Sequence, residues 1–128
     1  MVYLSIVSLN VGGLFSKLDL GILDIKLKDY DIVCLLETKT NLPIFKNTYF
    51  SNFEKIVLSN NSKGNFGGTH GICILIKPNL FKYVTELKGK SDSVLWLKID
   101  EKAFGFEFII GAVYIACDGS KFFNEDAF

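Results

Sequence analysis

Two short apolar runs, each followed by a polar residue, constrain the fold of this chain most. The first run covers residues 3–9 and leads into Asn10. The second covers residues 31–36 and leads into Glu37. A helical segment lies between them, so the three pieces predict an α/β crossover whose strands end on one edge of a sheet. Asn10 and Glu37 are therefore expected to meet there, where an amide and a carboxylate can hold a hard cation and orient a phosphate.

The helix between the two runs has its own start signal. Ser16 and Asp19 have the spacing of a capping box, which predicts a helix from this point to about Lys28. Its apolar residues form two stripes on nearly opposite sides: Leu18, Ile22 and Ile25 on one, and Leu20, Leu23 and Leu27 on the other. We therefore expect this helix to be covered by more than one sheet face.

Alternation and turn residues predict the remaining elements. Further strands are expected at residues 55–58, 72–77, 94–99 and 107–115, with a turn at 101–104 before the last one. Residues 41–52 and 59–68 are rich in Asn, Ser, Gly or Pro and are expected to be loops. Residues 119–128 have the composition of a second helix that is beginning. The pattern thus predicts six strands and one or two helices.

Length and hydropathy limit the class of protein. With 128 residues there is room for one small domain, and 49% hydrophobic residues with a mean hydropathy of +0.31 argue against disorder. The longest apolar stretch, residues 108–117, is shorter than the roughly 20 residues of a membrane helix, so a buried strand is expected and a membrane partner is not. No basic segment precedes the first apolar run, which argues against secretion and favours an intracellular location in the nucleus or cytoplasm.

Cysteines and charges give weaker indications. Cys34, Cys73 and Cys117 lie in apolar strands at long spacings unlike those of a zinc site, so we expect buried free thiols. The formal net charge is zero, and lysine supplies all fourteen basic residues. The charge therefore neither indicates nor excludes a nucleic-acid partner, and any phosphate contact must use lysine, backbone amides or small polar groups.

Five segments, in their order and spacing, carry a family resemblance. They are SLNVGGL at residues 8–14, YDIVCLLETK at 30–39, GGTHGICILI at 67–76, SVLWLK at 93–98 and GAVYI at 111–115. Together they resemble the first half of the endonuclease/exonuclease/phosphatase superfamily. The closer resemblance is to the N-terminal endonuclease domains of non-LTR retrotransposon polyproteins, which accompany a reverse transcriptase.

The resemblance implies an α/β fold that is half of a four-layer, DNase I-like α/β sandwich. We expect residues 1–128 to form a single truncated domain, with one mixed, mostly antiparallel sheet and helices on one face. The other face of such a sheet would be a bare apolar surface larger than monomers tolerate. This arrangement predicts poor solubility, a homodimer, or a missing C-terminal half that covers the face.

The resemblance also assigns roles to three residues. Glu37 matches the family's ligand for Mg²⁺ (or Mn²⁺), and Asn10 matches an asparagine that orients this glutamate or contacts the scissile phosphate. Tyr114 matches a tyrosine whose hydroxyl lies beside the phosphate. Each has a plainer interpretation from the residues alone. In that interpretation Glu37 is a surface residue that ends a strand, Asn10 forms a turn before two glycines, and Tyr114 is a core aromatic.

Other polar and glycine residues are expected to be structural. His70 is the only histidine, but it does not match the family's catalytic histidine, so a loop or strand-edge position is expected. Gly67, Gly68 and Gly71 lack the lysine spacing of a phosphate-binding loop and are interpreted as turn glycines.

Two family segments have no counterpart in these residues: the Gly-Asp-Phe-Asn segment and the Ser-Asp-His segment. They supply a transition-state asparagine, an orienting aspartate and the general base. We therefore expect a Mg²⁺-dependent DNA endonuclease in the complete form and no turnover from this chain alone. The alternatives are a non-catalytic interaction module with the same fold and a phosphatase of the same superfamily.

Overall fold

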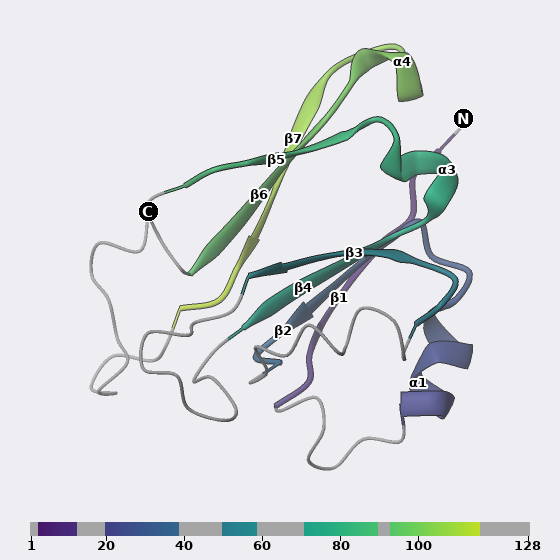
Figure 1. Cartoon of the computed structure of the whole chain (residues 1–128), viewed down its shortest axis with the longest axis vertical. Coiled ribbons are helices and arrows are strands. Elements are labelled where there is room, and N and C mark those ends of the chain that lie inside the picture. Colours follow the sequence, from purple (N-terminus) through teal and green to yellow (C-terminus); the bar gives the residue numbers. More distant parts are fainter. Residues whose placement is uncertain (1–2, 13–19, 39–49, 59–70, 90–92, 116–128) are drawn as a thin grey trace.

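The computed structural model describes residues 3–12, 20–38, 50–58, 71–89 and 93–115 (Figure 1). In chain order, the elements of these residues are β1 (Ile6–Asn10), α1 (Leu20–Leu27), β2 (Ile32–Leu36), β3 (Glu54–Leu58), β4 (Ile72–Ile76), α3 (Pro78–Phe81), β5 (Val84–Leu87), β6 (Val94–Ile99), α4 (Glu101–Phe104) and β7 (Phe108–Val113). The capping residues expected at Ser16 and Asp19 lie outside the described part, as do the expected second helix and Cys117.

The first sheet confirms the predicted crossover. Its strand order is β1-β2-β4-β3, with β1 parallel to β2 and the other two pairs antiparallel. Isoleucine, leucine, valine and cysteine make up β2 and β4, and four of the five residues of β2 and all five of β4 are buried. Central strands covered on both faces require such continuous apolar runs.

The second sheet is antiparallel, in the order β5-β6-β7. The turn expected at 101–104 is a single helical turn, α4. Asp100 caps it by accepting the backbone N–H of Lys102 at 2.8 Å, and Gly105 ends it in the left-handed conformation. Strand β5 and the short helix α3 were not predicted from the sequence.

The expectation of a single sheet is wrong, because the described strands divide into sheets of four and three. Pro78 begins α3 directly after β4, and the chain then continues in β5 as an edge strand of the second sheet. Proline favours such a position because its ring suits the first turn of a helix and cannot continue a strand ladder. The mixed α/β class itself is confirmed.

The two sheets pack face to face, as Figure 1 shows. The cluster between them contains Ile32, Cys34, Ile72, Ile74 and Ile76 of the first sheet and Leu95, Leu97, Ile99 and Ala112 of the second. The predicted bare inner face is therefore also wrong, since the second sheet covers the central strands of the first. This face is therefore not the bare surface from which poor solubility or dimerisation is expected.

Helix α1 covers the opposite face of the first sheet. Leu23 and Leu27 join a second apolar cluster with Val33 and Leu35 of β2. The other predicted stripe does not pack in the described part, where Ile22 and Ile25 are exposed. In that same part, no helix is long and apolar enough to cross a lipid bilayer.

The predicted free thiols are confirmed for Cys34 and Cys73, which are both buried. Burial raises the pKa of the Cys34 thiol from its ordinary value of 9.0 to about 11. Between these two pH values the unfolded chain loses a thiol proton that the folded chain keeps. We therefore expect the free energy of unfolding to fall as pH rises from about 9 to about 11.

Urea unfolding at several pH values, with Cys34→Ala as the comparison, tests this prediction. The variant should lose less stability over the same pH interval, because the shifted thiol is absent. Equal losses in both proteins would contradict the prediction.

Candidate metal centre at the ends of the parallel strands

Asn10 and Glu37 lie at neighbouring strand ends, as the sequence predicted. Asn10 is the last residue of β1 and lies opposite Leu36, the last residue of β2, so Glu37 follows directly. The backbone N–H of Val11 donates to the carbonyl of Leu36 at 2.9 Å and continues the pairing past the end of the strands. In Figure 1 the carboxyl ends of β1 and β2 lie at the lower side of the first sheet.

The side chain of Asn10 also forms the turn that its plainer interpretation predicted. Its Oδ1 accepts the backbone N–H of Gly12 at 3.0 Å, and Gly12 has a φ of 58°. An amide oxygen has two lone pairs, so this bond leaves one lone pair of Oδ1 and both N–H donors for a ligand. The turn thus orients Asn10 without using up its binding capacity.

Glu37 has a left-handed backbone conformation, with a φ of 59°. This conformation costs a non-glycine residue about 1–2 kcal/mol, and such strain concentrates at functional sites. Hydrogen bonds hold the chain on both sides of Glu37. The Leu36 carbonyl accepts from Val11, and the Thr38 N–H donates to the carbonyl of Gly71 at 3.1 Å. The hydrogen bonds of Leu36 and Thr38 therefore fix the backbone that carries the half-buried Glu37 side chain.

Thr38 is a polar residue of this site that the sequence analysis missed. It is only 1% exposed, and its Oγ1 is buried with no hydrogen-bond partner among the described residues. A buried hydroxyl of this kind needs an explanation, such as an unseen ion or ligand. The one available signal was its position directly after Glu37 in the family-like segment.

Tyr114 belongs to the opposite sheet. It directly follows β7, its N–H donates to the carbonyl of Ser93 at 2.9 Å, and its half-buried ring packs on the cluster between the sheets. Strand β7 packs against β2 and β4. The end of β7 lies on the same side of the sandwich as the ends of β1 and β2 (Figure 1). Tyr114 thus has the predicted core contacts and also lies toward the end where Glu37 is found.

The other candidates are mostly outside the described residues. His70, Gly67 and Gly68 fall there. Gly71 is described, and its φ of 87° is the left-handed conformation that a turn glycine adopts readily. Its carbonyl supports Thr38, so it contributes to the backbone frame beside Glu37.

The oxygen donors at this end of the sheet are of the type that a hard divalent cation prefers. No cluster of three or more His, Cys, Asp or Glu side chains occurs in the part of the chain that the structure describes. Mg²⁺ commonly uses only one or two protein carboxylates and keeps several waters. Glu37 can supply the carboxylate, Asn10 the amide oxygen, and the buried Thr38 hydroxyl lies one residue from that carboxylate.

Comparison with known proteins supports the fold. No protein-family model and no curated protein matches this sequence. A solved structure does match: the crystal structure of an AP endonuclease from Leishmania major, with a TM-score of 0.68 and 17% sequence identity. The match covers 91% of this chain and 41% of that enzyme's chain, so this chain spans less than half of its length. Together with the packed sheets, this likeness shows that the chain has a DNase I-like α/β fold.

Proposed function

We propose that this chain is the N-terminal portion of a Mg²⁺-dependent DNA endonuclease of the retrotransposon type. The observation that carries the proposal is the position of Asn10 and Glu37 at the ends of two neighbouring parallel strands. The strained backbone of Glu37 and the unpartnered hydroxyl of Thr38 add support, because both are features that a bound ion would explain. The fold likeness to an AP endonuclease is consistent with a phosphodiester substrate.

Each residue has a stated role in the proposal. Glu37 holds Mg²⁺ (or Mn²⁺) through its carboxylate, with Asn10 Oδ1 as a second oxygen ligand. When bound, the cation polarises the phosphate and stabilises the leaving oxygen. The Asn10 amide N–H groups and the Tyr114 hydroxyl donate hydrogen bonds to the phosphate and hold it in place.

We further propose that the 128-residue chain binds the cation but does not turn over. The residues match only the first half of the family's motifs, and the Ser-Asp-His segment that supplies the water-activating histidine and its orienting aspartate has no counterpart among them. Catalytic residues that act as a unit lose nearly all of their effect when one member is removed.

Manganese binding provides a direct test of the metal site. In NMR spectra of the folded chain, substoichiometric Mn²⁺ should broaden the amide signals of Gly12, Glu37 and Thr38 before others. In Glu37→Gln the same broadening should require at least about ten times more Mn²⁺. Mutating a residue that only supports a metal ligand already lowers metal affinity by about tenfold or more, and this variant removes the ligand itself. Glu86→Gln is a matched control, because it removes a carboxylate from the second sheet. Broadening that is unaffected by Glu37→Gln would contradict the proposed metal site.

Nicking of supercoiled plasmid tests the catalytic part of the proposal. With Mg²⁺, the folded chain should nick no faster than Glu37→Gln or than the wild type with chelator. Nicking that depends on both Mg²⁺ and Glu37 would show that the first half suffices for catalysis. That result would retain the metal site and overturn the prediction of inactivity.

A further inference from the structure

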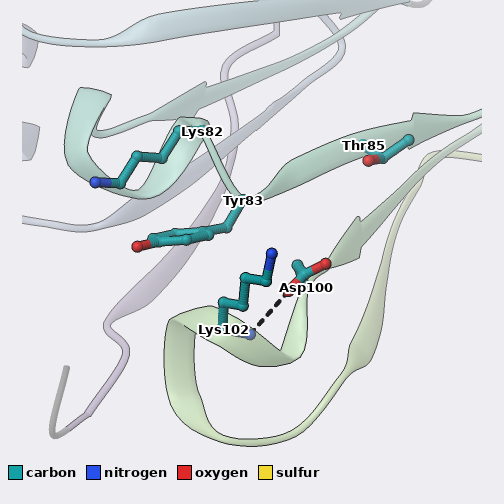
Figure 2. Close-up of a pocket in the computed structure, with 5 residues that line it drawn as sticks. All are labelled: Lys82, Tyr83, Thr85, Asp100 and Lys102. Carbon is teal, nitrogen blue, oxygen red and sulfur yellow. Dashed lines mark hydrogen bonds between the residues drawn. The ribbon is translucent and has the colours of Figure 1, made fainter.

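A second polar site lies at the other end of the sandwich. A pocket of about 250 Å³ is lined by Lys82, Tyr83, Thr85, Asp100 and Lys102 (Figure 2). Lys82 and Tyr83 directly follow α3, which begins just past the end of β4, whereas Thr38 bonds to Gly71 just before the start of β4. Strand β4 has five residues, or roughly 17 Å, so the pocket is distinct from the candidate metal centre.

The frame of this pocket is set by backbone hydrogen bonds. The N–H of Asp100 donates to the carbonyl of Tyr83 at 2.9 Å, which joins the start of β5 to the end of β6. The N–H of Tyr83 in turn donates to the carbonyl of Leu80 in α3. The pocket walls therefore come from three segments that are fixed to one another.

The two lysines of the pocket are not neutralised by a carboxylate partner among the described residues. Lys82 Nζ lies 5.1 Å from the centre of the Tyr83 ring, and Figure 2 shows Lys102 on the other side of that ring. Among the described residues, neither ammonium group forms an ion pair with a carboxylate. Asp100 Oδ1 accepts the backbone N–H of Lys102, so this carboxylate caps α4.

Charge and donors identify the ligand class. Two lysines and one aspartate give the pocket a charge of +1, and the exposed Thr85 hydroxyl adds a neutral donor. A phosphodiester carries one negative charge and two unesterified oxygens, which match this charge and these donors. A phosphate dianion would face the Asp100 carboxylate with an excess of negative charge.

We propose that this pocket binds a backbone phosphodiester of a nucleic-acid strand, at a site separate from the metal centre. This inference goes beyond the proposed function, since it requires neither Mg²⁺ nor Glu37. The sequence contains no arginine, so lysine must supply the positive charge for a phosphate. Lysine can do so because it binds phosphate as a point charge and does not need the planar geometry of a guanidinium group.

Fluorescence anisotropy with a labelled single-stranded oligonucleotide in excess chelator tests the proposal without the metal centre. The double variant Lys82→Gln/Lys102→Gln should bind roughly tenfold more weakly. For this variant, a plot of log affinity against log salt concentration should have a slope that is shallower by about 0.7 for each lysine removed. Lys88→Gln is the matched control, since Lys88 lies past the other end of β5 and its side chain is 89% exposed. Equal losses from Lys88→Gln would overturn the proposal.

Asp100→Asn gives a result of opposite sign. Asparagine caps a helix about as well as aspartate, so α4 should be retained while a negative charge leaves the pocket. The proposal expects tighter oligonucleotide binding in this variant, and unchanged or weaker binding would contradict it.

A parallel titration with inorganic phosphate distinguishes the source of the phosphate. Shifts of the Tyr83 and Thr85 amides by phosphate, with oligonucleotide binding insensitive to the lysines, would assign the pocket to a small phosphorylated molecule and overturn the strand assignment.

Discussion

Ile74→Ala is expected to lower the free energy of unfolding by about 2–5 kcal/mol. Ile74 lies at the middle of β4, opposite Cys34 of β2 and Ile56 of β3, and is fully buried. It belongs to the cluster between the two sheets, so truncation removes contacts with both. The structure cannot readily collapse into a cavity at this position, because β2 and β3 flank β4 and the second sheet packs on its face.

Ile109→Ala provides the matched control for this core prediction. The same side chain is removed from β7, where Ile109 is 57% exposed, and the expected change is within about 0.5 kcal/mol. Urea unfolding followed by circular dichroism measures both variants. Similar small losses from Ile74→Ala and Ile109→Ala would mean that the second sheet does not cover the first.

The first sheet and its helix could be predicted because their signals are local. Continuous apolar runs and the helical segment between them are sufficient to indicate a parallel pair, and a parallel pair fixes which ends meet. The position of Asn10 and Glu37 at neighbouring strand ends could therefore be predicted without any knowledge of the remaining strands. Cys34 and Cys73 were also predicted correctly, because their apolar neighbours indicate burial.

The division into two sheets could not be predicted in the same way. Alternation shows that a segment such as Val94–Ile99 is a strand, but not which sheet it joins, since partners are set by contacts distant in sequence. Strand β5 has only four residues, Val-Thr-Glu-Leu, which is too short a pattern to separate from a loop. Because β5 and α3 were not predicted, nothing in the sequence indicated that the chain leaves the first sheet after Ile76.

The sequence predicted where Asn10 and Glu37 lie in the sheet, but not the backbone conformation and burial around them. No glycine or asparagine marks residue 37, so its left-handed backbone has no sequence signal. The backbone N–H of the buried Thr38 donates to the carbonyl of Gly71, which the pairing of β2 with β4 brings beside it. Such features arise from tertiary contacts and become visible only when the strands are assembled.

Comparing Glu37→Gly with Glu37→Ala separates the strain of this backbone from the chemistry of the carboxylate. Both variants remove the proposed metal ligand, so both should bind Mn²⁺ at least about ten times more weakly than the wild type. Only glycine adopts a φ near 59° without steric cost. We therefore expect Glu37→Gly to be more stable than Glu37→Ala by about 1 kcal/mol, the reverse of the usual order for these two residues.

The reversed order is informative because ordinary effects oppose it. At a position with a negative φ, alanine is more stable than glycine, since glycine has more freedom to lose on folding. Urea unfolding of the two variants without metal measures this difference directly. Alanine equal to or better than glycine would show that Glu37 is unstrained. A more stable glycine variant that has lost Mn²⁺ affinity would show that the strained backbone at the end of β2 is retained at a cost in stability that cation binding explains.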